Sequence, residues 1–219
     1  MVYVNEVDFN YRYYQENILV VGMIGSGKTH LVQSILDSLP NTLKWIWDES
    51  DNFNQGIMVH DLNRLTKQNS VLRLQNRSQQ SFDEYMKVIY ENALSYELTN
   101  LVNVVDEVQK FTNPRDSDSY LFKTVTSMRN RGISNIFITP SPSLIPKWIR
   151  ENTIHFFGLK TSDYDHLDYM DKNFFGAEAW LLTTNDKRRK LQNEPNLGKY
   201  SYIYRNIYED ETQVYNSGL

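Results

Sequence analysis

The sequence contains no cysteine in its 219 residues, and it has only nine glycines, six prolines and four histidines. The absence of cysteine excludes disulfide bonds, thiol catalysis and cysteine-ligated metal sites, and it fits an intracellular location. No apolar stretch approaches the roughly 18 residues that a membrane-spanning helix needs. The amino terminus has neither the basic flank nor the apolar core of a signal peptide. We therefore expect a protein with no transmembrane segment.

Basic residues are fewer than acidic ones, with 23 Lys and Arg against 27 Asp and Glu, so the formal net charge is −4. The chain as a whole is therefore not expected to attract polyanions, and any contact with nucleic acid must be local. The one dense basic run consists of Lys187, Arg188, Arg189 and Lys190. This run is either a solvated loop or a local site of nucleic-acid contact.

Short apolar runs alternate with longer amphipathic segments, a pattern that is typical of parallel β-α units. The expected strands are 17–22, 43–47, 71–74, 101–105, 134–139, 154–159 and 200–205. The expected helices are 28–38, 81–98, 118–131 and 164–182, the last one broken near Asp171. Ser81 is expected to cap the helix 81–98, with Glu84 three residues further on.

The length and composition suit one α/β domain, because 40% of the residues are hydrophobic and 23% are charged. There is no repeat, low-complexity tract or domain linker, and residues 185–199 are polar enough to form a loop. We predict a single domain over residues 1–219, with a core of about 15–182 and a C-terminal extension at 183–219.

Residues 22–29 read Gly-Met-Ile-Gly-Ser-Gly-Lys-Thr, which is a complete G-x-x-x-x-G-K-[ST] phosphate-binding loop. The loop directly follows the apolar run 17–21 and precedes a helical pattern in which Leu31, Ile35 and Leu39 share one face. Strand, glycine loop and helix in this order are the context that the motif requires. The alternative, a glycine-rich turn with an exposed lysine, does not account for this context. The sequence therefore predicts binding of a nucleoside triphosphate.

The chemistry of the loop assigns a role to most of its residues. Glycine has no Cβ, so the loop can curl and direct its N–H groups at phosphate oxygens, helped by the positive end of the following helix. Lys28 would reach the β and γ phosphates, and the Thr29 hydroxyl would bind Mg²⁺. The residues expected to contact ATP are Gly22, Gly25, Ser26, Gly27, Lys28, Thr29 and His30.

A second motif, residues 101–107, is an apolar run that ends in two adjacent carboxylates, Asp106 and Glu107. A carboxylate at the end of a buried strand beside the phosphate loop can hold the Mg²⁺ ion, which is the role predicted for Asp106. A carboxylate one residue further on can orient and deprotonate the attacking water, which is the role predicted for Glu107. The pair could otherwise be two surface acids at a strand end. Beside a complete phosphate loop, it predicts ATP hydrolysis.

Other nucleotide-binding classes lack support. The sequence has no Asn-Lys-x-Asp for guanine recognition and no Leu-Ser-Gly-Gly-Gln of the transporter ATPases. Small-molecule kinases rarely carry adjacent Asp and Glu, because a bound acceptor rather than water attacks the phosphate. A kinase that acts on a small molecule is therefore a minor alternative. An ATPase of the AAA type that works as a switch in DNA replication, as a helicase loader or an initiator, is the stronger one.

The order of these motifs resembles the FtsK/HerA superfamily of DNA-translocating ATPases, and most closely the short genome-packaging ATPases of icosahedral viruses with internal membranes. The matching stretches are 22–29, 102–107, 127–143 and 145–152. The resemblance implies an α/β fold of the RecA-like (ASCE) P-loop NTPase type, with a mainly parallel central sheet flanked by helices on both faces. It also implies ATP and Mg²⁺ as cofactors and a homo-oligomeric ring, most simply a hexamer, acting on double-stranded DNA.

The resemblance also implies roles for residues outside the phosphate loop. In the family, an arginine after the Asp-Glu strand reaches the γ-phosphate of the neighbouring subunit, and the pattern Arg-x-x-Gly-Ile places Arg129 there, with Arg131 as the rival. Both could instead be exposed arginines at a helix end. The usual γ-phosphate-sensing glutamine falls on Pro140, so Thr139 or Ser141 would have to replace it. The basic residues that could contact DNA are Lys110, Arg115, Lys187, Arg188, Arg189 and Lys190.

A viral packaging ATPase implies a biological setting as well. The expected partners are double-stranded DNA, other copies of the chain and a capsid or portal vertex protein. The expected location is the cytoplasm of an infected cell, with association to virions as a further expectation.

Overall fold

The computed structural model describes residues 2–4, 16–39, 42–59, 62, 71–74, 78–184, 200–208 and 211–215. Within these residues, the strands are β1 (Val2–Val4), β2 (Ile18–Val21), β3 (Leu43–Trp47), β4 (Ile57–Val59), β5 (Val71–Leu74), β6 (Leu101–Val105), β7 (Ile133–Thr139), β8 (His155–Leu159), β9 (Tyr202–Asn206) and β10 (Glu211–Tyr215). The α-helices are α1 (Lys28–Asp37), α2 (Gln79–Leu94), α3 (Tyr120–Ser127), α4 (Lys147–Glu151) and α5 (Tyr164–Met170). No helix among the described residues is long and apolar enough to cross a membrane.

All the described strands belong to one sheet, in the order β1-β10-β9-β8-β2-β7-β6-β3-β5-β4. The strands from β8 to β4 run parallel, whereas β9 runs antiparallel to both β8 and β10. In β2, β6, β7 and β8 every residue is buried, as expected for parallel strands that are covered on both faces. Because β7 separates β2 from β6, one strand lies between the phosphate-loop strand and the Asp-Glu strand.

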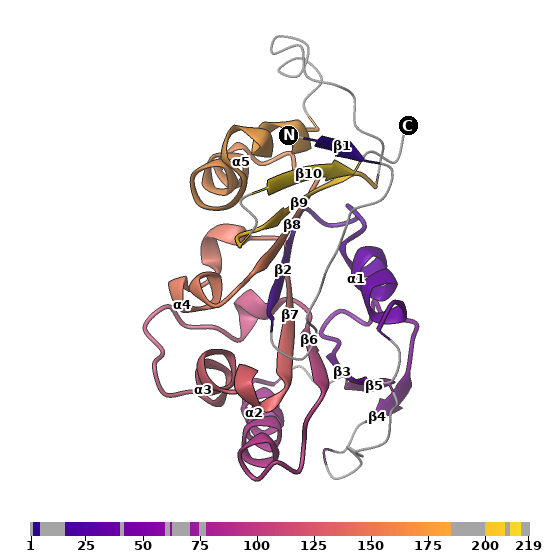
Figure 1. Cartoon of the computed structure of the whole chain (residues 1–219), viewed down its shortest axis with the longest axis vertical. Helices are drawn as coiled ribbons and strands as arrows, with labels where there is room; N and C mark the ends of the chain where they lie inside the picture. The colour runs from indigo at the N-terminus through magenta and orange to yellow at the C-terminus, as the bar shows by residue number, and fades with distance from the viewer. Residues whose placement is uncertain are drawn as a thin grey trace.

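Helices cover both faces of the sheet, with α1 on one face and α2 to α5 on the other (Figure 1). On β2, Ile18 and Val20 pack with α1, whereas Leu19 and Val21 point to the opposite face and belong to the core beneath α2 to α5. The alternation along this strand creates two apolar cores, one on each side of the sheet. The predicted fold class, a mainly parallel sheet between two helical layers, is confirmed.

Most of the predicted elements are present, and the differences lie at their ends. The break predicted near Asp171 is confirmed, because α5 is followed by a π-helical turn, η5 (Asp171–Phe175), and a 3-10 segment, η6 (Gly176–Leu182). The helix predicted at 118–131 divides into α3 and a 3-10 turn, η3 (Arg129–Arg131). Strands β1, β4 and β10 and helix α4 were not predicted. The loop predicted at 185–199 lies outside the described residues.

The predicted cap of the helix at 81–98 is wrong. Helix α2 begins at Gln79, and its cap is Ser78, whose side-chain oxygen accepts a hydrogen bond from the Ser81 backbone N–H. Two polar residues, Gln79 and Gln80, form an exposed first turn before the apolar face begins. Apolar periodicity therefore placed the start of the helix too late.

A row of buried amide side chains crosses the sheet beneath α2. The Tyr85 hydroxyl donates to Asn103 on β6, and the Asn103 amide donates to Asn135 on β7 at 2.9 Å. The Asn135 amide in turn donates to Asn17 at 2.9 Å, and the Asn17 amide donates to the Asn152 carbonyl at 2.8 Å. Because these buried polar groups satisfy one another, they fit inside an otherwise apolar core.

Candidate nucleotide-binding and hydrolysis site

The phosphate loop leaves the carboxyl end of β2 and enters α1 at Lys28. Its first residues are held by backbone hydrogen bonds, from the Gly22 N–H to the Thr139 carbonyl at 3.3 Å and from the Met23 N–H to the Lys160 carbonyl at 3.0 Å. The loop lines one wall of a cavity of about 460 Å³. The cavity is lined by Ile24, Gly25, Gly27, Lys28, Thr29, His30, Gln33, Asn52, Asp106 and Glu107. The structure thus brings both sequence motifs to one site.

Two glycines of the loop are required by the space and the backbone around them. A Cβ at Gly22 would lie 2.8 Å from both the Leu159 Cβ and the Ser26 Oγ, which is closer than real Cβ contacts allow. Gly27 has a φ of +101°, a conformation that L side chains rarely adopt, and a Cβ there would lie 3.0 Å from the Tyr200 ring. The curled loop therefore depends on glycine at both positions.

Lys28 holds its ammonium group over the loop. Its Nζ donates to the carbonyl oxygens of Gly22 at 2.8 Å and Met23 at 3.0 Å. Burial lowers the pKa of Lys28, and the nearby carboxylates of Asp106 and Glu107 oppose that effect. The side chain is placed at the cavity wall, where its positive charge can meet a phosphate group.

Asp106 carries the most strongly perturbed carboxyl group of the cavity. Burial, and then the nearby carboxylates of Glu107 and Asp48, raise the pKa of Asp106 to about 6. Its Oδ1 accepts a hydrogen bond from the Glu107 backbone N–H at 3.0 Å, whereas its buried Oδ2 has no partner among the described residues. A buried, unpartnered carboxylate oxygen and the Thr29 hydroxyl in the lining of one cavity are oxygen donors of the kind that a hard cation such as Mg²⁺ takes. The residues present therefore fit Mg²⁺.

Glu107 lies one residue beyond the strand and takes a left-handed backbone conformation, with a φ of 54°. This conformation turns the chain sharply into the 3-10 turn η2 (Val108–Lys110). The Glu107 side chain lines the cavity, and its Oε2 accepts a hydrogen bond from the Gln109 side chain at 2.6 Å. A partly exposed carboxylate beside the phosphate loop is positioned as a general base for water.

A second acidic pair, Asp48 and Glu49, was missed in the sequence. The pair follows β3, whose Trp47 lies opposite Val105 of β6, so Asp48 and Asp106 leave neighbouring strands at the same level. Asp48 is fully buried, accepts hydrogen bonds from two backbone N–H groups and forms an ion pair with Arg73 at 3.4 Å. Burial raises the pKa of Asp48 despite these contacts. An apolar run ending in Asp-Glu was the available signal, because it repeats the pattern of residues 101–107.

Thr139 ends β7 directly beside the phosphate loop. Its backbone carbonyl accepts the Gly22 N–H, and its buried side-chain hydroxyl accepts the Ser141 N–H at 3.0 Å. The predicted replacement for a γ-phosphate sensor therefore lies next to the loop.

The two candidate trans-acting arginines do not lie at the cavity. Arg129 and Arg131 form η3 at the amino end of β7, whereas the loop contacts its carboxyl end, so the seven residues of β7 separate them by roughly 20 Å. The Arg131 guanidinium donates to the Leu94 carbonyl at 3.3 Å and lies 3.9 Å from the centre of the Tyr96 ring. The structure thus keeps both arginines away from the phosphate loop of their own chain.

The remaining predicted residues are dispersed. His30 is exposed at the cavity, and its ring centre lies 6.3 Å from that of Tyr200. Lys110 lies near the cavity and forms an ion pair with Glu49, whereas Arg115 is exposed on the following loop. The basic run 187–190 lies outside the described residues.

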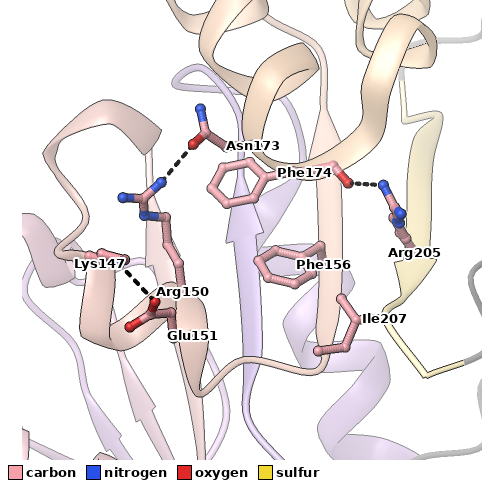
Figure 2. Close-up of a pocket in the computed structure, with 8 residues that line it drawn as sticks. All are labelled: Lys147, Arg150, Glu151, Phe156, Asn173, Phe174, Arg205 and Ile207. Atoms are coloured by element: carbon pink, nitrogen blue, oxygen red, sulfur yellow. Dashed lines mark hydrogen bonds and ion pairs between the residues drawn. The ribbon is translucent and has the colours of Figure 1, made fainter.

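A second cavity, of about 450 Å³, lies between α4, η5 and β9. Figure 2 shows Phe156 and Phe174 within it and two arginines at its sides. Arg150 donates to the Asn173 side chain at 2.8 Å, and Arg205 donates to the Phe174 carbonyl at 2.8 Å. Its lining contains neither a glycine loop nor an acidic pair like those of the first cavity.

The fold and the site together define a P-loop NTPase of the type with one strand between the phosphate-loop strand and the Asp-Glu strand. No protein-family model and no curated protein matches the sequence.

Several solved structures, however, are similar to this chain over almost its full length. The genome packaging NTPase B204 from Sulfolobus turreted icosahedral virus 2, in complex with ATP-gammaS, superposes with a TM-score of 0.70 at 12% identity. The match covers 91% of this chain and 96% of that chain. The pCW3 conjugation coupling protein TcpA superposes with a TM-score of 0.58 at 13% identity, over 93% of this chain and 60% of that chain. The similarity to packaging ATPases that the motifs indicated is thus confirmed at the level of the fold.

Proposed function

We propose that this protein is an ATP-hydrolysing motor that moves double-stranded DNA into a viral capsid. The observation that supports this most strongly is the fold shared over 91% of the chain with a genome packaging NTPase, combined with an intact phosphate loop facing Asp106 and Glu107. That NTPase has also been solved with AMPPCP, which supports ATP as the nucleotide.

In the proposed reaction, Lys28 and the loop N–H groups bind the β and γ phosphates. Thr29 and Asp106 would hold Mg²⁺, which stabilises negative charge on the phosphates when it is bound. Glu107 takes the proton of the attacking water. Thr139, whose carbonyl accepts the Gly22 N–H beside the loop, would contact the γ-phosphate from the end of β7.

The position of the two arginines supports a ring. Neither can reach the phosphate loop of its own chain, so either can act only on a neighbouring copy. Arg129 is the better candidate, because the Arg131 guanidinium is already held by the Leu94 carbonyl and the Tyr96 ring. A cation supplied in trans is worth about 10³–10⁵ in rate, and it links hydrolysis to assembly. We further propose that the ring is a hexamer and that it binds a capsid or portal vertex protein. Its proposed location is the cytoplasm of an infected cell, with association to virions.

The test is phosphate release from ATP with and without linear duplex DNA. We expect duplex DNA to stimulate the wild type, and the Glu107→Gln and Arg129→Ala variants to be inactive alone. Mixing these two inactive variants should restore activity, because a Glu107→Gln subunit can supply Arg129 to a neighbour whose own Glu107 is intact. Arg131→Ala is the matched control and should not need such complementation.

Two results would reject the motor. If duplex DNA does not stimulate turnover, or if DNA binding is insensitive to salt, the proposal fails, because phosphate contacts make affinity fall steeply with salt. Slow turnover without stimulation would favour the replication-switch alternative, and phosphoryl transfer to a small acceptor would favour a kinase.

A further inference from the structure

The second cavity lies away from the nucleotide site. Its volume of about 450 Å³ is close to that of the first cavity, and the two share no described lining residue. Phe156 lies near the amino end of β8, and Ile207 directly follows the antiparallel strand β9. The phosphate loop instead follows the carboxyl end of β2, which runs parallel to β8. The second cavity is therefore at the opposite end of these strands, and the proposed reaction does not use it.

Arg150 brings a positive charge to this cavity without an acidic partner. Its guanidinium donates to the Asn173 side-chain oxygen at 2.8 Å and lies 5.4 Å from the centre of the Tyr169 ring. Among the described residues no carboxylate pairs with Arg150, and its buried Nε has no hydrogen-bond partner. A guanidinium has five N–H donors in a planar fork that matches the two oxygens of a carboxylate. Arg150 therefore has donors left for an anionic group.

Asn173 holds this guanidinium in place. The Asn173 side-chain amide donates to the Tyr169 carbonyl at 2.7 Å, and its oxygen accepts the hydrogen bond from Arg150. Asn173 and Phe174 both belong to η5, and π-helical turns are rare and often lie at functional sites. The donors of Arg150 are thus presented in a fixed direction, which lowers the entropic cost of binding a ligand.

The space beside Arg150 is apolar. The Phe156 and Phe174 rings stack with their centres 5.0 Å apart, and the nearby Ile207 is 43% exposed. Arg205 lies on the other side of the rings and donates to the Phe174 carbonyl (Figure 2). An apolar side chain that covers Ile207 would remove its surface from water. The cavity therefore offers an anion site and an apolar site next to each other.

These features fit a protein segment better than a nucleic acid. The two phenylalanine rings are only 6% and 3% exposed, so a base has no ring face on which to stack. The Glu151 side chain in the lining is 60% exposed and pairs with Lys147 at 3.2 Å, and its negative charge would repel a run of phosphates. A peptide can instead supply a single carboxylate beside a single aliphatic side chain.

We propose that the second cavity binds a short segment of a partner protein in which an acidic residue is next to an aliphatic one. The carboxylate of the segment accepts hydrogen bonds from the Arg150 guanidinium, and the aliphatic side chain packs over Ile207. This inference goes beyond the proposed motor and does not depend on it, because the cavity has no part in ATP binding or hydrolysis.

The probe is the peptide Gly-Ser-Glu-Leu-Ser-Gly, acetylated and amidated at its ends so that the Glu side chain carries its only charge. Calorimetry without ATP or DNA should give a dissociation constant on the order of 0.1 mM. Arg150→Gln should weaken binding about 10-fold, because it removes a charged hydrogen-bond donor. Ile207→Ser, and a peptide with Gln in place of Glu, should each weaken binding severalfold. Lys87→Gln, on the exposed face of α2, is the control and should bind the peptide as the wild type does.

Four results would reject the inference. The peptide does not bind at millimolar concentration, or the Glu and Gln peptides bind equally, or Arg150→Gln keeps the wild-type affinity for the peptide. The fourth is that a short duplex DNA displaces the peptide and loses affinity in Arg150→Gln, because the cavity would then be a nucleic-acid site. Should Arg150→Gln fail to fold, Ile207→Ser takes its place, since it changes an exposed side chain, and an unchanged peptide affinity in that variant rejects the inference.

Discussion

Replacing Asp106 with asparagine is expected to stabilise the folded protein at neutral pH while abolishing hydrolysis. The pKa of Asp106 is raised from its usual value of 3.8 to about 6 because the carboxylate is buried beside Asp48 and Glu107. Between these two values the folded state keeps a proton that the unfolded state releases. The free energy of unfolding therefore decreases as the pH rises through this range, and above it the folded state bears the full cost of ionisation.

The size of this cost follows from the change in pKa. A change of about two pKa units corresponds to about 3 kcal/mol, which is an upper estimate for a group that is 3% exposed. Asparagine keeps an oxygen for the Glu107 N–H, carries no charge and is nearly the same size. With a urea dependence of about 2–3 kcal/mol per molar, the unfolding midpoint at pH 8 should rise by about 1 M.

Urea unfolding between pH 4 and pH 8 (about the range of the effect), with EDTA and no nucleotide, measures this difference. The variant should be more stable than the wild type at the alkaline end and similar to it at the acidic end. Asp48 also has a raised pKa and adds to the pH dependence of both proteins, so the difference between them reports Asp106 together with its interaction with Asp48. Asp83→Asn, an exposed carboxylate on α2, is the control and should change stability little. Equal stability at pH 8, with the same pH dependence, would refute the reasoning.

Three further predictions concern the loop and the core. Lys28→Ala should weaken binding of an ATP analogue about 10- to 100-fold in calorimetry, because it removes a charged hydrogen-bond donor. Tyr85→Phe should lower the free energy of urea unfolding by about 1–3 kcal/mol, because it removes the hydroxyl that donates to the buried Asn103 oxygen. Gly158→Ala should cost about 1–3 kcal/mol and lower the melting temperature, since the new Cβ would lie 2.6 Å from the Phe175 ring. If one of these measurements is the same in the variant and in the wild type, the contact on which that prediction rests is contradicted.

The phosphate loop could be located from the sequence because all of its determinants are local. The strand before Gly22, the glycines and the helix after Lys28 follow one another in the chain, so motif and context confirm each other. Asp106 and Glu107 were found for the same reason, since an apolar strand leads directly into them. The buried position of Asp106, and with it the raised pKa, could not be predicted, because it depends on how neighbouring strands are arranged.

The role of the second acidic pair could not be predicted from the sequence. Asp48 and Glu49 matter only because β3 pairs with β6, and strand order is a property of the whole sheet. The contact between Lys110 and Glu49 likewise joins segments far apart in the chain. Lys110 was therefore predicted only as a basic residue that could meet DNA.

The arginines were found by similarity to a family pattern, and their distance from the loop was not predicted. Arg131 also illustrates a limit of motif reading, because its guanidinium contacts the Leu94 carbonyl and the Tyr96 ring, which no spacing rule connects to it. These contacts add a physical difference between Arg131 and Arg129, which the sequence pattern already favoured.

The row of buried amides that crosses the sheet affects the register in which the strands pair and their resistance to sliding past one another. Asn103 lies opposite Asn135 in the native register, and a slip of one residue would place Ser134 or Ile136 there and leave a buried amide without its partner. Apart from such polar positions, β2, β6 and β7 are mostly apolar, and their apolar side chains alone distinguish poorly between such alignments. The same hydrogen bonds join adjacent strands side by side and so resist sliding of one past another. In the packaging motor proposed above, these side-chain hydrogen bonds would add to the main-chain hydrogen bonds of the sheet in resisting shear between the strands.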